Sequence, residues 1–168
     1  PGKHVEFTWG SNNRVTAVRD PAGNEWRYGY NTAGMLTSVT SPGASPDVRT
    51  YHYEAADSTL LTGISINGVR STRYAYQADG KVSVSGLENG EERDTFAYAD
   101  KKTTVTSASG QTTVYTFVSV GSNLLLSKTS RNAALNCPAA AAEIAFDTRG
   151  YVDYIKDWNG VTADYSYD

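Results

Sequence analysis

Few side chains in this sequence have the type and spacing that a reaction centre needs. The two histidines, His4 and His52, are far apart, and neither has a cysteine or second histidine at metal-ligand spacing. His52 stands between two tyrosines, so in an extended strand it should point to the opposite face as a surface histidine. Cys137 is the single cysteine, which excludes a disulfide within the chain. We interpret Cys137 as an unreactive loop thiol, the alternative being a crosslink to another part of a parent chain.

Several carboxylates near the C-terminal end raise the question of paired acids for glycoside hydrolysis. The candidates are Glu143, Asp147, Asp153 and Asp157. In a strand, Asp153 and Asp157 would share one face with Tyr151 and Ile155, which a solvated strand edge explains more simply. No Gly-x-Ser-x-Gly nucleophile elbow and no Gly-x-x-x-x-Gly-Lys phosphate loop occurs. We therefore predict no catalytic residues, no cofactor and no metal site, and a protein that is not an enzyme.

The composition indicates strands and excludes two classes of partner. The chain has 168 residues, of which 19 are Thr, 16 are Ser and 12 are Tyr, all frequent in β-structure. The formal net charge is only -3, without long runs of one sign, so we expect no nucleic-acid partner. The longest apolar stretch is Leu124 to Leu126, so no membrane span is expected. The chain starts without Met or a leader-like apolar segment, and we interpret it as an excised fragment of a larger protein.

Aromatic residues recur in pairs whose two members are separated by one residue. The paired positions are Phe7 with Trp9, Tyr28 with Tyr30, Tyr51 with Tyr53, Tyr74 with Tyr76, Phe96 with Tyr98, Tyr115 with Phe117, Ile144 with Phe146, and Tyr165 with Tyr167. Successive pairs start 21, 23, 23, 22, 19, 29 and 21 residues apart. Such a period indicates an array of structural repeats, and we predict one array of about seven units over residues 1–168.

Turn residues follow the same period and divide each unit into two strands. The residues six positions after the first aromatic of each pair are Asn13, Gly34, Asp57, Gly80, Lys102, Gly121 and Gly150. All except Lys102 are Gly, Asn or Asp, which accept a left-handed backbone, and a second turn signal precedes five of the pairs. The predicted turn glycines are Gly23, Gly34, Gly68, Gly80, Gly90, Gly110, Gly121, Gly150 and Gly160. Each unit therefore reads as strand, turn, strand, turn, which is the pattern of a β-hairpin.

The predicted fold is all-β, an array of antiparallel hairpins forming a long curved sheet. Between turns the residues alternate with period two, as in Asn24 to Tyr30, whose aromatic residues share one face. Seven units give about fourteen strands, and an open sheet of more than ~10 strands tends to curl. We expect residues 41–47, which carry two prolines, and residues 130–142 to lie outside the sheet. The short segment 136–143 is the single helix candidate, with Asn136 as a possible N-cap.

The repeat resembles the YD-repeat of the Rhs family. The segments that carry the resemblance are Tyr28 to Thr40, Phe146 to Gly150 and Asp157 to Asp168, in which an aromatic pair, a turn glycine and a branched strand alternate. The resemblance covers nearly the whole chain from Phe7 onward. The Tyr-Asp dipeptide that gives the repeat its name survives only at Tyr167-Asp168, with Phe146-Asp147 close to it. The units are therefore divergent ones.

The resemblance implies a shell and a secreted toxin. Members of the family include bacterial polymorphic toxins exported by type VI or other routes, shell components of insecticidal toxin complexes, and teneurins. It implies a spiralling strip of hairpins, part of a cocoon, that encloses and helps deliver a C-terminal effector, in a parent protein that is secreted or at the bacterial cell surface. The partners would then be the rest of the parent chain and the enclosed effector.

One short string matches the family's self-cleaving aspartyl protease, which follows the repeats. Asp20-Pro21-Ala22-Gly23 has its Asp-Pro-x-Gly form, but no second such segment is present to complete an acid dyad. A turn with proline at its second position and glycine at its fourth explains the string fully. We therefore interpret this segment as a turn.

The aromatic pairs leave two functional classes open. Stacked rings across neighbouring strands can hold a wall together, whereas exposed rings can form a platform for sugars or a partner protein. Nearly every unit repeats the pair, which favours a structural shell segment over an extracellular glycan- or protein-binding adhesion module. A single sheet also leaves free edges and an apolar face, through which the chain is expected to self-associate.

Overall fold

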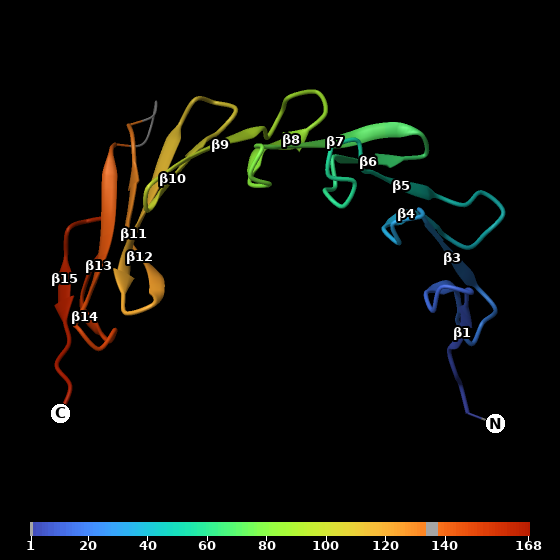
Figure 1. Cartoon of the computed structure of the whole chain (residues 1–168), viewed down its shortest axis with the longest axis horizontal. Coiled ribbons are helices and arrows are strands. Elements are labelled where there is room, and N and C mark those ends of the chain that lie inside the picture. Colours follow the sequence, from blue (N-terminus) through green and yellow to red (C-terminus); the bar gives the residue numbers. More distant parts are fainter. Residues whose placement is uncertain (1, 134–137) are drawn as a thin grey trace. The chain divides into compact units, whose positions relative to one another are not determined.

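The computed structural model describes residues 2–133 and 138–168 and contains strands joined by turns and loops, without a helix among these residues. The chain divides into two compact units, Pro1–Glu91 and Glu92–Asp168. We refer to them as unit 1 and unit 2. In both units each strand pairs antiparallel with its neighbours in sequence, as the colour order of Figure 1 shows. This confirms the predicted all-β hairpin array.

Unit 1 is a meander of eight strands. They are β1 (Glu6–Trp9), β2 (Val15–Arg19), β3 (Glu25–Tyr30), β4 (Leu36–Thr40), β5 (Val48–His52), β6 (Gly63–Ile66), β7 (Val69–Tyr76) and β8 (Val82–Leu87). Every consecutive pair from β1 to β8 is hydrogen-bonded.

Unit 2 is a meander of seven strands among the described residues. They are β9 (Asp94–Ala99), β10 (Lys102–Thr106), β11 (Thr112–Val120), β12 (Asn123–Arg131), β13 (Ala140–Phe146), β14 (Val152–Lys156) and β15 (Thr162–Asp164). Strands β11 and β12 have nine residues each and form the longest hairpin described.

Most turns in both units share one hydrogen-bond pattern. In the turn after β2, the Asp20 N–H donates to the Asn24 carbonyl at 2.9 Å, and the Gly23 N–H donates to the Asp20 carbonyl at 3.0 Å. Gly23 has a φ of +88°, which places it in the left-handed region. This is the three-residue hairpin loop of a type I turn followed by a left-handed residue. The same pair of bonds closes the turns that end at Gly34, Gly80, Gly90, Gly110, Gly150 and Gly160.

A β-bulge recurs beside the second aromatic residue of the pair. In the β3–β4 hairpin, Gly29 pairs with Ser38 and Tyr30 pairs with Leu36, so Thr37 is left out of the register. Five hairpins have this shift, and the residues left out are Thr16, Thr37, Ser83, Ser127 and Asp153. A bulge at the same place in successive hairpins adds the same local twist to each of them.

The β9–β10 hairpin departs from this pattern. Phe96 pairs with Val105 and Tyr98 pairs with Thr103, and the register between them is continuous. Tyr98, the second aromatic residue of its pair, therefore has no bulge opposite it. The turn that follows has two residues, fewer than the three-residue loops described above, with a left-handed residue at Lys101 directly before β10.

The sheet of unit 1 has one aromatic face and one polar face. Residues paired across antiparallel strands share a face. The aromatic face therefore contains two sets joined by pairing: Phe7, Val18 and Trp26 in one, and Tyr28, Val39 and the exposed Arg49 in the other. The polar face contains Thr8, Ala17, Arg27 and Thr40, which alternate with them. The period-two pattern of the sequence thus appears as two chemically different faces.

Neither unit has an apolar core in its described part. No hydrophobic side chain is buried among residues 2–133 and 138–168, and most aromatic residues are half-buried. A sheet normally covers its apolar face with a second layer. Here the single layer is held by ladder hydrogen bonds and cross-strand side-chain contacts.

The structure corrects the prediction for the insertion at residues 130–142. β12 continues to Arg131 and β13 begins at Ala140, so both ends of this segment belong to the sheet. The helix candidate 136–143 is wrong over residues 140–143, which are in β13, and residues 136 and 137, including Cys137, lie outside the described residues. The alanines at 140–142 favour a helix by themselves, but they pair with β12 and therefore adopt an extended conformation. The loop at residues 41–47 lies between β4 and β5, as predicted.

Candidate functional site

A polar cluster in unit 1 contains the side chains that are most shielded from solvent. Thr62 and Ser65, which are 8% and 5% exposed, are the buried polar residues in the described part of the chain. Gly63 between them is also buried. A Cβ added at Gly63 would lie 2.5 Å from the Thr72 carbonyl oxygen, so only glycine fits between these strands. The sheet is therefore tightest at this polar position and not at an aromatic pair.

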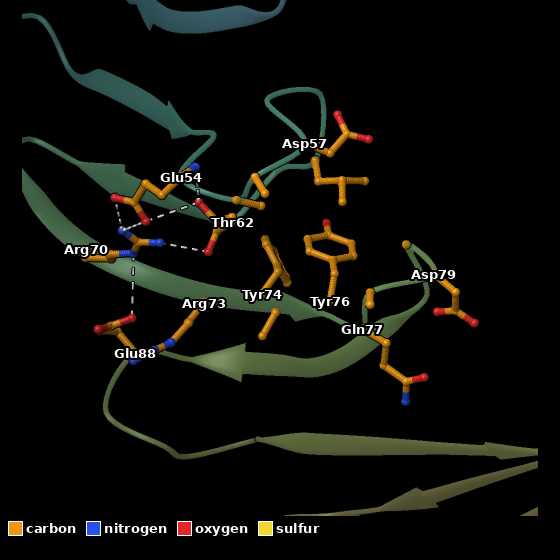
Figure 2. Close-up of a pocket in the computed structure, with 16 residues that line it drawn as sticks. Glu54, Asp57, Thr62, Arg70, Arg73, Tyr74, Tyr76, Gln77, Asp79 and Glu88 are labelled. Atoms are coloured by element: carbon orange, nitrogen blue, oxygen red, sulfur yellow. Dashed lines mark hydrogen bonds and ion pairs between the residues drawn. The ribbon is translucent and has the colours of Figure 1, made fainter.

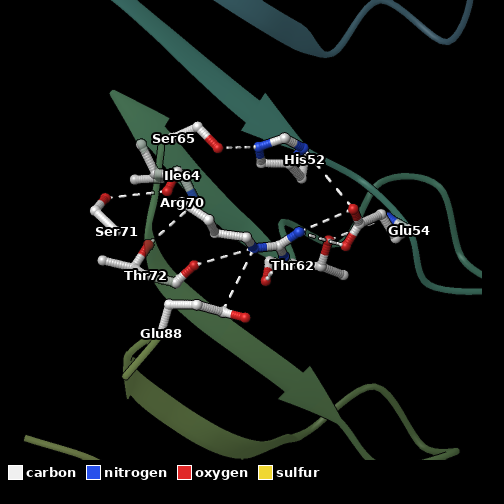
Figure 3. Close-up of polar contacts among 9 residues, drawn as sticks. All are labelled: His52, Glu54, Thr62, Ile64, Ser65, Arg70, Ser71, Thr72 and Glu88. Atoms are coloured by element: carbon white, nitrogen blue, oxygen red, sulfur yellow. Dashed lines mark hydrogen bonds and ion pairs between the residues drawn. The ribbon is translucent and has the colours of Figure 1, made fainter. Parts of the chain in front are cut away.

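Arg70 is the centre of this cluster, as Figure 3 shows. Its Nη1 lies 2.9 Å from both carboxylate oxygens of Glu54, and its Nη2 donates to the Thr62 carbonyl at 2.7 Å. Its Nε lies 3.7 Å from a carboxylate oxygen of Glu88. Because Glu54 follows β5 and Glu88 follows β8, one guanidinium joins the two ends of a four-strand segment.

The hydrogen bonds around the Glu54 carboxylate favour its ionised form. The hydrogen bonds from Arg70 hold the pKa of the Glu54 carboxyl below its ordinary value, and a hydrogen bond from the Thr62 hydroxyl acts in the same direction. The Thr62 hydroxyl also accepts from the Glu54 N–H at 3.1 Å. The Glu54 side chain is 58% exposed, so solvent weakens these interactions. The cluster fixes the loop after β5 to β6.

His52 and Ser65 form a contact that resembles part of a serine–histidine–acid triad. His52 Nε2 lies 2.7 Å from Ser65 Oγ, and His52 Nδ1 lies 3.8 Å from Glu54 Oε1. The second distance is longer than a hydrogen bond. Arg70 occupies both oxygens of Glu54, and Ser65 is 5% exposed. A nucleophile needs access to substrate and an acid free to orient the base, so this arrangement suits strand-to-strand bonding.

An open depression of about 850 Å³ lies beside the cluster. Figure 2 shows it between β7 and the loop that carries Asp57, with Tyr74 and Tyr76 on the same side of β7. Its carboxylates already have partners, since Asp57 accepts from Thr59 and Asp79 contacts Lys81 at 2.7 Å. The depression therefore has a mixed lining without an unpaired acid pair.

Tyrosine hydroxyls join successive hairpins of unit 1. Tyr30, Tyr53 and Tyr76, the second members of three aromatic pairs, each donate to a backbone carbonyl of a preceding strand or loop. The acceptors are Val15 at 2.8 Å, Leu36 at 3.0 Å and Leu61 at 2.6 Å. We call these three contacts the tyrosine links.

Burial supports the tyrosine links as donors. It raises the pKa of the Tyr53 and Tyr76 hydroxyls above their ordinary value. A tyrosine hydroxyl is protonated at neutral pH, and the raised pKa extends the pH range over which these two hydroxyls donate to the carbonyls. Each link spans 15 to 17 residues of sequence, so it connects one hairpin to the previous one.

The paired aromatic residues identified from the sequence lie in or beside the first strand of each hairpin. They are in β1, β3, β5, β7, β9, β11 and β13, except that Tyr53 follows β5 and that Tyr165 and Tyr167 follow β15. Phe7, Trp9, Tyr165 and Tyr167 are 45–63% exposed, whereas the pairs between them are half-buried. All nine glycines predicted to be in turns have φ between +58° and +90°.

The three pairs of unit 2 between Phe96 and Phe146 share this half-buried setting but differ in their second residue. Tyr98 lies in β9 opposite Thr103, whereas Phe117 and Phe146 lie beside the bulges of their hairpins. Tyr98 therefore differs from Trp9, Tyr30, Tyr76, Phe117 and Phe146, which lie beside a bulge, and resembles Tyr53, whose β5–β6 hairpin also has a continuous register.

The carboxylates that suggested acid chemistry are distributed over turns and a strand. The carboxylates of Asp20, Asp147 and Asp157 accept backbone N–H bonds within their own turns. Glu143 contacts Lys128 across the β12–β13 pair at 2.5 Å. The segment Asp20-Pro21-Ala22-Gly23 is a turn, as interpreted from its sequence.

The bulge changes the expected position of Asp153. Asp153 is the residue left out of the β13–β14 register, so the alternation expected from Tyr151 to Asp157 is interrupted. Asp157 lies beyond the end of β14. The interruption concerns the pairing with β13, since Tyr151, Asp153 and Ile155 are all exposed and alternate with the half-buried Val152 and Tyr154, as expected for a solvated face.

The sequence reasoning missed the polar cluster and the bulge. Ser and Thr side chains at the bulges donate across the pair, as Thr16 does to the Thr8 carbonyl, Ser127 to Thr116 and Ser71 to Ile64. A hydroxyl nine residues after the opening aromatic, at Thr16, Thr37 and Ser83, was the available signal. The cluster had no such signal, because His52, Glu54, Thr62 and Arg70 come together only through strand pairing.

Metal-binding and membrane-spanning features are absent from the described residues. They contain no group of three or more His, Cys, Asp or Glu side chains placed to hold a metal ion. They also contain no helix long and apolar enough to cross a membrane.

One segment of the chain matches a protein-family model. Residues 11–46 match the family model described as RHS Repeat, which confirms the resemblance to the Rhs/YD-repeat family at this segment. The matched segment runs from the turn before β2 to the loop after β4 and includes the bulge residues Thr16 and Thr37. No curated protein sequence matches the chain significantly.

Similar solved structures include crystal structures of TcdB2-TccC3. The TcdB2-TccC3 structure has a TM-score of 0.48 and 14% sequence identity, and the match covers 90% of this chain and 10% of that one. TcdB2-TccC3 without its hypervariable C-terminal region has a TM-score of 0.48 and 15% identity, over 88% of this chain and 10% of that one. The chain spans about a tenth of the length of the solved chains it matches.

Proposed function

We propose that this chain is a wall segment of a secreted Rhs-type shell that encloses an effector polypeptide and contributes no reaction of its own. The observation that carries the proposal is the uninterrupted neighbour-to-neighbour strand pairing within each unit, with the same turn and the same bulge repeated. The RHS repeat at residues 11–46 supports it.

The bonding pattern suits a wall because its contacts act between hairpins. The tyrosine links and the Arg70 cluster both join one hairpin to another, so opening the sheet requires several of them to break together. The buried hydroxyls of Thr62 and Ser65 and the ring of His52 are used in bonds between neighbouring strands and the loop after β5. These residues therefore stabilise the sheet of unit 1.

Protease protection in the full-length protein tests the proposal. A recognition peptide for a site-specific protease is inserted after the array, at the expected position of the effector. The same peptide inserted in the loop at residues 43–47, which is exposed, serves as the matched control. We expect cleavage in the loop and protection after the array.

Equal cleavage at both positions in the folded protein would refute the enclosing role. A hydrolytic activity of the chain that is lost on changing His52 or Ser65 to alanine, while the fold is retained, would refute the absence of a reaction of its own. Protection after the array that disappears when the three linked tyrosines are changed to phenylalanine would strengthen the proposal.

A further inference from the structure

Three turns contain the dipeptide Asn-Gly, at Asn67-Gly68, Asn89-Gly90 and Asn159-Gly160. In this dipeptide the glycine nitrogen can attack the Cγ of the asparagine side chain, because glycine has no Cβ to hinder the approach. A Cγ–N bond forms, the Cγ–Nδ2 bond breaks, and ammonia leaves with the proton of the glycine N–H. Water then opens the resulting succinimide to aspartate or isoaspartate. All three asparagines are exposed, so exposure alone does not rank them.

The side chain of Asn67 is held at both of its polar atoms. Its Oδ1 accepts from the Val48 N–H at 2.8 Å, and its Nδ2 donates to a carboxylate oxygen of Asp47 at 2.8 Å. Movement of Cγ toward the Gly68 nitrogen would break both bonds, so they protect Asn67 although its turn is exposed. Among the described residues no backbone carbonyl accepts from the Gly68 N–H, so the protection comes from the held side chain.

Asn89 and Asn159 occupy the same position in the same type of hairpin loop. In both loops the glycine that follows donates its N–H to the carbonyl of the first turn residue at 3.0 Å. The two glycines also have nearly equal φ angles, +87° and +85°. The attacking nitrogen therefore has the same setting in both turns, and the asparagine side chains are what differ.

The first residue of each turn determines whether the asparagine side chain is held. Asp157 opens one turn, and its Oδ1 accepts from the N–H of the last turn residue at 2.9 Å. Leu87 opens the other turn and has no side-chain acceptor, so Asn89 Oδ1 accepts the corresponding N–H at 3.0 Å. The side chain of Asn159 makes no hydrogen bond to the described residues. It is therefore free to rotate toward the glycine nitrogen.

We propose that Asn159 is a site of spontaneous deamidation in the folded chain, that Asn67 is protected from this reaction, and that Asn89 reacts at an intermediate rate. The order follows from the side-chain hydrogen bonds to described residues that must break, which are none at Asn159, one at Asn89 and two at Asn67. Each bond should slow the reaction by about fivefold. This inference does not depend on the enclosing role proposed above.

Modification of Asn159 acts on the pairing of β15. Isoaspartate adds one backbone atom to the loop between β14 and β15, and aspartate adds a negative charge beside Asp157. β15 pairs with β14 at three positions only, and its residues are all exposed. Because the loop sets the register of a hairpin, a longer or more strongly charged loop should weaken this short pairing.

Peptide mapping by mass spectrometry of the full chain, aged at neutral pH and physiological temperature, tests the proposal. Fragmentation by electron transfer distinguishes isoaspartate from aspartate and from unmodified asparagine. The same chain aged in denaturant is the matched control, because there the three asparagines differ little and should react at similar rates. Two variants sharpen the test. Asp47→Ala removes the acceptor of the Asn67 side chain, and Asn159→Gln lengthens the side chain so that the five-membered ring cannot form.

In the folded chain we expect modification at Asn159 about 25-fold faster than at Asn67, and similar rates at the two positions in denaturant. Asp47→Ala should speed the reaction at Asn67 about fivefold. Equal rates at Asn67 and Asn159 in the folded chain would overturn the proposal, as would an Asn159 that stays unmodified while the unfolded chain reacts. Hydrogen exchange in β15 should be faster in the aged chain than in the aged Asn159→Gln variant, and equal exchange would refute the effect on β15.

Discussion

Units 1 and 2 are built from the same hairpin but hold their hairpins together differently. In unit 1 the second aromatic residue of three pairs is a tyrosine whose hydroxyl bonds to an earlier strand or loop. In unit 2 the corresponding residues of two pairs are Phe117 and Phe146, which have no hydroxyl. Unit 2 instead has the long β11–β12 hairpin and a Lys128–Glu143 ion pair on its polar face. Hairpins can therefore share one backbone pattern while their cohesion depends on local side chains.

The largest predicted effect is on the tyrosine links. Changing Tyr30, Tyr53 and Tyr76 together to phenylalanine should destabilise unit 1 by ~3 kcal/mol, since each hydrogen bond contributes about 1 kcal/mol. Hydrogen exchange measured by mass spectrometry should show faster exchange in β2 to β7 and unchanged exchange in β11 and β12. The matched control, Phe117→Tyr with Phe146→Tyr, should not slow exchange in unit 2. Equal acceleration in both units would contradict this account.

The second prediction concerns the tightest point of unit 1. Gly63→Ala should destabilise the β5–β7 region by about 2 kcal/mol, because its Cβ would contact the Thr72 carbonyl and Arg70. Chemical denaturation followed by intrinsic fluorescence measures the loss. Gly2→Ala, at a position with nothing within 4 Å of an added Cβ, is the control that should be neutral. A neutral Gly63→Ala would show that the strands are not close there.

The third prediction concerns pH. Since Arg70 lowers the pKa of Glu54 in the folded chain, the cluster contributes stability above the ordinary pKa of a glutamate. That contribution is lost as the pH falls through the lowered pKa of Glu54, so the loop after β5 should open below about pH 4.5. Hydrogen exchange of residues 53–62 at pH 7 and at acid pH measures it. Glu54→Gln should remove most of the pH dependence of hydrogen exchange in this loop. If the full pH dependence remained in this variant, a group other than Glu54 would be responsible for it.

The smallest predicted effect is in a turn of unit 2. Lys101 has a φ of +50°, which a side chain with a Cβ disfavours. Lys101→Gly should therefore stabilise the β9–β10 hairpin by about 0.5 kcal/mol, the gain being reduced by the flexibility of glycine in the unfolded chain. The opposite change in unit 1, Gly80→Ala at φ +81°, should destabilise by about 1 kcal/mol. The thermal unfolding midpoints of the two variants, compared with that of the unchanged chain, measure both effects.

The hairpins were predictable from the sequence because their signals are local. Asp20, Asn24 and Gly23 form a complete turn within five residues, and the alternation in β3 assigns Tyr28 to one face without knowledge of its partner. The β9–β10 hairpin is the exception, since period counting from Phe96 places its turn residue at Lys102 and the left-handed residue is Lys101. Counting fails by one residue because the strand after Tyr98 pairs without a bulge and the turn is shorter.

The polar cluster and the tyrosine links were not predictable, since they depend on register between strands far apart in sequence. Arg70 reaches Glu54 because the β6–β7 pair shifts by one residue at Ser71. The period of the aromatic pairs gives the number of hairpins but not this shift. The run of alanines in β13 shows the same limit, because its pairing with β12 overrides its local preference for helix.

The measurement that tests the central claim most directly is a residue-level map of amide hydrogen exchange over the whole chain. A wall of hairpins without an apolar core should show protection in every strand of both units, interrupted at each turn, so that protection recurs about every 11 residues, twice in each hairpin unit. A globular protein with one core would show a single strongly protected block and rapid exchange elsewhere. That second result would contradict the account.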